Sequence, residues 1–203
     1  MKKIILLFTL SFFILSSSFA QEEKERGFKK EQLFLGTGVN VGFFQGWILG
    51  LNPEVGYSLN NFLDAGVSVN LNYVTRNYST LLVNNVYYDK AQVRFFSYGG
   101  GPFLRAWIVN QFFITSQFEF NQISESFRSQ GATIYKTKYT APSLLIGGGW
   151  GNRMIGKSQV YTSIMVDILR DKNSPYIDQS TGTLLPVFRT TFALYLKTRN
   201  QRR

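Results

Sequence analysis

Residues 151–158, Gly-Asn-Arg-Met-Ile-Gly-Lys-Ser, have the spacing of a phosphate-binding loop. Such a loop binds phosphate because its glycine-rich backbone leads into a helix N-terminus, whose N–H groups point at the anion. Here the residues after Ser158 alternate with a period of two, which is typical of a strand, and Asp167 follows on the same strand. The sequence therefore favours a turn between two strands, with Arg153 and Lys157 in solvent.

The other residues that could do chemistry are charges within the alternating segments. One face of the predicted strands carries seven of them: Glu54, Asp64, Lys90, Arg94, Glu119, Asp167 and Arg189. Glu119 and Asp167 could serve as an acid and base, but no spacing favours this over ion pairing. The chain has no Cys and no His, which excludes thiol chemistry, His-based catalysis and most zinc sites. We therefore expect no enzymatic activity, no catalytic or metal-binding residue and no cofactor.

Residues 63–73 show most clearly how such side chains would be positioned. Their odd positions are Leu, Ala, Val, Val, Leu and Tyr, and their even positions are Asp, Gly, Ser, Asn and Asn. Successive side chains on a strand point to opposite faces, so this strand has one apolar and one polar face. A soluble antiparallel strand has the same pattern, and the rest of the chain must decide which face is inside.

Seven further segments alternate in the same way, and none has a helical period. The eight predicted strands cover residues 33–41, 47–59, 63–73, 88–108, 112–121, 139–150, 160–168 and 187–196. Alternate connections are long and polar, at 75–87, 123–138 and 170–186. This pattern predicts an all-β fold, an eight-stranded antiparallel up-and-down transmembrane β-barrel. The three consecutive glycines at 99–101 predict a bulge or phase shift in the fourth strand.

Aromatic residues near the strand ends indicate that the apolar faces point outward into lipid. Two interfacial girdles are predicted from Trp47, Tyr57, Tyr73, Phe112, Phe120, Trp150 and Phe188. The opposite faces are rich in small polar residues, which suit the narrow lumen of an eight-stranded barrel. We expect the seven charges to form a salt-bridged network that fills this lumen, in preference to a conduit or a ligand site. Asp167 and Arg189 are expected to lie close, because their strands are neighbours.

The N-terminus predicts export. A short basic start, an apolar run and the small residues Ser18 and Ala20 fit a signal peptide cleaved after Ala20. The predicted organisation is a signal peptide at 1–20, a flexible periplasmic lead-in at 21–32, the barrel at 33–197 and a basic tail at 198–203.

The mature chain resembles the small outer-membrane β-barrel proteins of Gram-negative bacteria, in particular the "outer membrane protein beta-barrel domain" proteins of Bacteroidetes. The resemblance rests on the signal peptide, on glycine-rich strands such as 35–38 and 147–150, and on the closing strand 186–196. It implies location in the cell outer membrane, contact with its lipid and insertion by the barrel-insertion machinery. Many barrels of this family end on an aromatic residue, whereas this chain continues through residues 197–203.

Three functions are compatible with these observations. The first is a non-enzymatic outer-membrane barrel with an envelope-structural, adhesion or partner-binding role, carried by extracellular loops 75–87, 123–138 and 170–186. The second is a secreted soluble lipocalin-like barrel that binds a small apolar ligand, and the third is a weak small-solute channel. The formal charge of +10 could suggest nucleic acid, but Lys and Arg are scattered over turns and strand ends, so no nucleic-acid partner is expected.

Overall fold

The structure is a computed structural model that describes residues 28–43, 47–83, 85–177 and 182–196. A short 3₁₀ turn, η1 (Lys30–Gln32), precedes the first strand. The strands are β1 (Leu33–Phe43), β2 (Trp47–Ser58), β3 (Leu63–Val83), β4 (Val86–Trp107), β5 (Phe112–Ser129), β6 (Ala132–Gly151), β7 (Gln159–Asp167) and β8 (Val187–Tyr195). No helix in these ranges is long and apolar enough to cross a membrane. The predicted signal peptide at 1–20 and basic tail at 198–203 lie outside the described residues.

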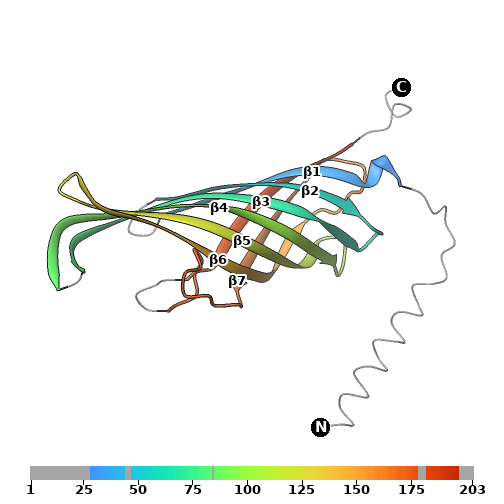
Figure 1. Cartoon of the computed structure of the whole chain (residues 1–203). Coiled ribbons are helices and arrows are strands. Elements are labelled where there is room, and N and C mark those ends of the chain that lie inside the picture. The colour runs from blue at the N-terminus through green and yellow to red at the C-terminus, as the bar shows by residue number, and fades with distance from the viewer. Residues whose placement is uncertain (1–27, 44–46, 84, 178–181, 197–203) are drawn as a thin grey trace, which may run out of the picture.

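The eight strands form one closed antiparallel barrel in chain order (Figure 1). Each strand pairs with the next, and β1 closes the ring by pairing with β8, with Thr37 opposite Phe192. The prediction of an all-β, eight-stranded, up-and-down barrel is therefore confirmed. Burial alternates strictly along β7 and β8, as a period-two strand with one inward and one outward face requires.

The strands are of two lengths. β1, β2, β7 and β8 have 9–12 residues, whereas β3 to β6 have 18–22 and run past the end of the others (Figure 1). We call this projection, residues 74–95 and 124–138, the arm. The predictions of long loops at 75–87 and 123–138 were wrong, because both segments are mostly paired strand. The predicted loop at 170–186 is irregular over its described residues, apart from an isolated bridge between Ile177 and Leu184. We call the described residues 168–177 and 182–186 together segment 168–186.

The arm has a small apolar cluster of its own. Ala91, Val93 and Phe127 are buried there, and the ring of Tyr88 meets that of Phe127 edge-on, with centroids 5.1 Å apart. One hairpin tip has Gln130 and Gly131 at positive φ, which is the backbone of a two-residue hairpin turn. Paired strands can therefore continue beyond the barrel without its core.

The expected phase shift in β4 does not occur. The register with β3 runs unbroken from Leu63–Ala106 to Tyr78–Ala91, so odd residues of β4 face inward from Ala91 to Trp107. The glycines at 99–101 serve a different purpose. A Cβ at Gly101 would overlap the backbone carbonyl of Phe118, so these glycines permit close approach within a regular ladder. A register irregularity lies instead between β5 and β6, at Phe127 and Arg128.

Aromatic rings pack inside the barrel at the end of the short turns. Phe34, Phe103, Trp107, Phe113, Tyr161, Ala193 and Tyr195 form this buried cluster. Glycine on the inner face leaves room for the rings, since a Cβ at Gly56 would overlap the ring of Phe34. The remaining interior is polar, and that part contains the candidate site.

Candidate functional site in the barrel interior

One group of charges lies near the aromatic cluster, and we call it the turn-side network: Glu54, Asp64, Arg105, Arg153 and Tyr161. The guanidinium of Arg105 donates to both carboxylate oxygens of Glu54 at 3.3 Å and to the Tyr161 hydroxyl at 2.8 Å. It also lies 4.1 Å from the centroid of the Tyr161 ring, a cation–π arrangement. The Tyr161 hydroxyl in turn donates to Glu54. The carboxylate of Glu54 is therefore neutralised by a charged donor and a phenol.

Asp64, which is fully buried, is the second carboxylate of this network. It accepts hydrogen bonds from Arg153 at 2.8 Å, from the Trp107 indole N–H at 2.8 Å and from the Ser58 hydroxyl at 2.7 Å. The Arg105 guanidinium is 4.0 Å away. Two carboxylates and two guanidinium groups thus balance in charge at this end of the lumen.

Arg153 belongs to the segment that resembles a phosphate-binding loop. Residues 152–158 form a turn with Gly156 at φ 80° and no helix follows, which confirms the predicted turn. The prediction that Arg153 lies in solvent was wrong, because only 9% of it is exposed. Its guanidinium also donates to the carbonyls of Asn60 at 2.8 Å and Asn61 at 2.6 Å, so it fastens two short turns together across the barrel end.

A second group lies towards segment 168–186, and we call it the loop-side network: Gln117, Glu119, Tyr176 and Arg189. Arg189 donates to Gln117 at 2.7 Å and to Glu119 at 3.4 Å. Gln117 donates to the same carboxylate at 2.7 Å. The Tyr176 hydroxyl donates to the other carboxylate oxygen of Glu119 at 2.6 Å. Tyr176 belongs to the predicted extracellular loop 170–186, but it is only 7% exposed because it inserts into the barrel mouth.

Asp167 has different partners from those expected. Asp167 and Arg189 both face inward, but Arg189 lies opposite Ser163 in the ladder and pairs with Glu119. Asp167 accepts from the Ser174 hydroxyl at 2.6 Å and from the backbone N–H groups of Leu144 and Leu169. Asp167 therefore holds segment 168–186 onto the barrel.

The structure places Lys90 and Arg94 on the arm, outside the lumen. Lys90 is exposed, and Arg94 is partly exposed and donates to Gln92 at 2.6 Å. Their predicted inward orientation was wrong because it depended on the phase shift that β4 lacks. Arg105 and Arg153 take the place of these two cations in the lumen. If the alternation is continued without a break from Ala91 to Trp107, the odd residues share one face, and this would have placed Arg105 in the lumen.

The predicted girdle residues all point outward. Trp47, Tyr73, Phe112, Phe120, Trp150 and Phe188 are exposed, and Tyr57 is partly exposed. Tyr57 has additional contacts, since its hydroxyl bonds Gln32 at 2.6 Å and its ring stacks on Phe28. Trp150 and Phe112 are direct neighbours across β5 and β6, next to the short turns.

The interior chemistry is that of a neutralised, hydrogen-bonded filling. Glu54, Asp64, Glu119 and Asp167 each accept from at least two donors, so all four are bound as ion pairs or hydrogen-bonded carboxylates. In the described ranges, no group of three or more Asp, Glu, His or Cys is placed to hold a metal ion. The fold and site define a class: an antiparallel eight-stranded barrel with apolar residues outside and charges inside.

Comparison with known proteins adds two solved structures. No family model matches the chain, and no curated protein matches it. One structural match is Ail, the attachment invasion locus protein of Yersinia pestis, in complex with the heparin analogue sucrose octasulfate, at 16% identity and a TM-score of 0.36, covering 79% of this chain and 92% of that one. Another is Yersinia pestis Ail in a phospholipid bilayer nanodisc, at 11% identity and a TM-score of 0.39, covering 80% and 98%. Both TM-scores are below 0.5, and the fold assignment rests on the closed ring of strands itself.

Proposed function

We propose that this chain is a non-enzymatic outer-membrane β-barrel protein that spans the bilayer with a packed polar lumen. The main support is that polar and charged side chains lie inside the barrel and apolar side chains lie outside, the reverse of a soluble protein. Ion pairs fill the inside, whereas large apolar side chains cover the outside, among them Leu35, Val55, Val67, Leu104, Ile114, Ile164 and Leu194. Soluble proteins rarely expose contiguous apolar surface of this extent, but in a bilayer the same surface faces hydrocarbon.

The interior argues against the two alternative functions. A soluble lipocalin-like barrel needs an apolar cavity for its ligand, but this lumen is occupied by two ion-pair networks. A small-solute channel needs an open polar path, but Tyr176 and Ser174 enter the loop-side end and bond to Glu119 and Asp167. The geometry therefore favours a closed scaffold over a conduit.

A closed scaffold leaves its projecting parts as the functional surface. The arm and segment 168–186 lie at one end, opposite the short turns (Figure 1). Under the proposal this end is extracellular, the aromatic residues form the two girdles, and the arm has an envelope-structural, adhesion or partner-binding role. Insertion by the barrel machinery follows from the same proposal.

Cysteine labelling in intact cells tests the proposed location and orientation together. The exposed residues Asn77, Gln130 and Asn173 at the arm end would each be changed to Cys, with Lys157→Cys in a short turn as the control. We expect a membrane-impermeant maleimide to label the first three and to label Lys157→Cys only after lysis. Recovery of the protein in the soluble fraction without detergent, or labelling of Lys157→Cys in intact cells, would contradict the proposal.

A further inference from the structure

The outward face of the arm is strongly basic. Four cations point outward by strand alternation, namely Arg94, Arg128, Lys136 and Lys138. A fifth, Lys90, is exposed at φ 50° and borders the same surface cavity as Arg94 and Arg128. The two described carboxylates of the arm lie on the other face, where Asp89 bonds Thr80 and Glu125 bonds Tyr135 and Tyr139. We call the five residues the basic face. Like charges crowded on one surface repel each other, so this face favours an anionic partner.

The strand register places the basic face next to outward aromatic residues. Arg94 lies across from Ser126, which lies across from Lys136. In the adjacent outward row, Phe96 lies across from Ser124, which lies across from Lys138. Tyr98 and Phe120 follow in the next rows towards the barrel. At about 3.3 Å per residue, Arg94 lies roughly 7 Å along the strand from Phe96 and about 13 Å from Tyr98.

The side chains of the basic face keep donors available to a ligand. None of the five forms an ion pair with a described carboxylate. Arg94 donates through Nε to Gln92, and Arg128 donates through Nη2 to the carbonyl of Gly131. Lys90, Arg94 and Arg128 border a surface cavity of about 480 Å³, whose other lining residues are polar except for Tyr78 and the small Ala91 and Gly131. Ammonium and guanidinium groups around such a hollow have the geometry and charge to bind phosphate.

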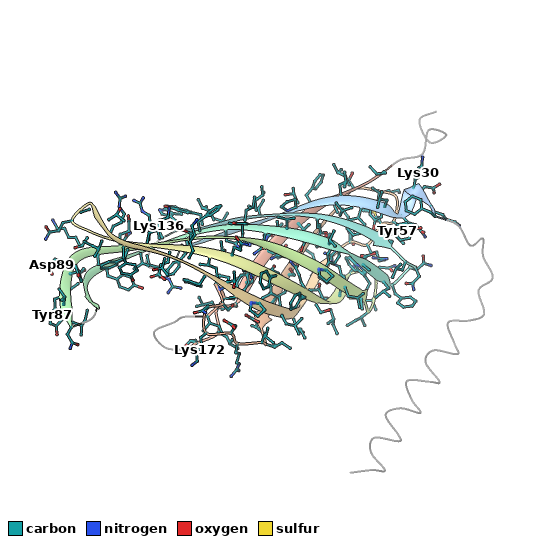
Figure 2. The ribbon with its side chains drawn as sticks, viewed as in Figure 1. Lys30, Tyr57, Tyr87, Asp89, Lys136 and Lys172 are labelled. Atoms are coloured by element: carbon teal, nitrogen blue, oxygen red, sulfur yellow. The ribbon has the colours of Figure 1, made fainter. Side chains whose placement is uncertain are left out.

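We propose that the basic face binds the phosphate groups of glycolipid head groups in the leaflet around the barrel. This inference rests on the proposed membrane-spanning function. It commits to a lipid because the cations lie on the side of the sheet that continues into the lipid-facing surface, directly beyond its aromatic rows. A head group at that height would place its acyl chains against the apolar exterior and its phosphates beside Lys136 and Lys138. Figure 2 labels Lys136 on the arm.

The test compares one lipid with and without its phosphates. The folded mature chain in mild detergent would be titrated with bisphosphorylated lipid A or with its dephosphorylated form, and the bound lipid would be counted by native mass spectrometry. We expect the phosphorylated lipid to bind at least tenfold more tightly. The variant K136Q/K138Q should lose about tenfold of that affinity, because each surface cation contributes a several-fold preference.

A matched control removes two exposed cations from the opposite end of the barrel. K30Q/K157Q should bind the phosphorylated lipid as the unmodified chain does, since Lys30 and Lys136 lie at opposite ends (Figure 2). Equal affinity for both lipids, or an equal loss in the two double variants, would overturn the inference. Loss of binding to a soluble heparin fragment in K136Q/K138Q, with lipid binding unchanged, would overturn it in favour of a soluble polyanion.

Insertion into phosphatidylcholine vesicles separates this inference from the proposed function. A chain that does not insert, as judged by a heat-modifiable gel shift, would overturn both. A chain that inserts but shows no preference for phosphorylated lipid would overturn only the assignment of the basic face.

Discussion

Arg153 illustrates how a single buried cation can join parts of the barrel that are far apart in sequence. It bonds Asp64 and the carbonyls of Asn60 and Asn61, so Arg153→Gln leaves three acceptors short of a donor. We expect a loss of about 3 kcal/mol in the free energy of unfolding, which is typical when one partner of a buried ion pair is removed. Urea unfolding of the two proteins in lipid vesicles measures this loss in the free energy of unfolding.

Lys157 provides the control in the same turn. It is exposed, so Lys157→Gln should change the free energy of unfolding by less than about 0.5 kcal/mol. Equal effects of the two substitutions would mean that Arg153 is not fastened to the barrel end as described.

Gly56 tests the packing of the aromatic cluster. A Cβ at this position would overlap the ring of Phe34, so Gly56→Ala should lower the free energy of unfolding by about 1–3 kcal/mol through overpacking. At Gly148, which is partly exposed, a Cβ would meet only the carbonyl of Phe113 at 3.4 Å, and Gly148→Ala should be close to neutral. The double variant G56A/F34L should recover part of this loss in the free energy of unfolding. If it does not, overlap with the Phe34 ring is not the cause of the loss.

At the residue scale, alternation predicted the inward positions of Glu54, Asp64, Glu119, Asp167 and Arg189. It could not identify their partners, because pairing across a barrel depends on strand stagger and side-chain reach. Arg105 was missed because the run of glycines was interpreted as a change of phase. Arg153 was missed because a cation in a turn is usually solvated, and its burial depends on a second turn that lies 92 residues away in the sequence.

Among the elements, segment 168–186 is fastened from within the barrel. Tyr176→Phe retains the ring but removes the hydroxyl that donates to Glu119. The backbone amides of Ser174 and Ile177, which bond Asp171 and Ser174 within this segment, should then exchange hydrogen about tenfold faster or more, since a buried hydrogen bond to a charged group contributes roughly 1.5–3 kcal/mol. Hydrogen-exchange mass spectrometry of the folded barrel in micelles measures this rate.

The control for Tyr176 is Tyr87→Phe, because Tyr87 is 74% exposed at the arm end (Figure 2). It should leave the exchange of segment 168–177 unchanged. If Tyr176→Phe left it unchanged as well, the hydroxyl would not be what holds the segment, which would depend on the bond between Ser174 and Asp167 and on packing of the residue-176 ring.

The arm shows where sequence patterns stop predicting elements. Within the barrel one face of a strand is apolar and the other polar, so the period of two is visible. Beyond it both faces of most arm positions meet water, and strands such as 75–83 and 132–138 carry polar residues on both faces. A polar strand and a polar loop then have the same composition, and only the cross-strand pairs and the small cluster around Phe127 distinguish them.

For the whole molecule, the inside and outside surfaces determine the solvent in which the barrel is stable. Most charges of the inner surface are balanced by ion pairs and hydrogen bonds, although both polar atoms of the buried Asn52 amide have no partner among the described residues. Under the proposed function, the exposed apolar side chains of the barrel face hydrocarbon, whereas the arm stays in water. A cation placed on the same face of the same strand should therefore have opposite consequences at these two heights.

Val69 and Asn77 provide this comparison on β3. Both side chains point outward, and Val69 is 48% exposed, level with the barrel, while Asn77 is exposed on the arm. If the barrel spans a bilayer, Val69→Arg should cost about 2–4 kcal/mol of insertion stability, because a guanidinium is transferred into hydrocarbon. Asn77→Arg should cost almost nothing, since that position stays in water. Urea unfolding from phosphatidylcholine vesicles measures both, and equal, small effects would mean that the exterior of the barrel does not face lipid.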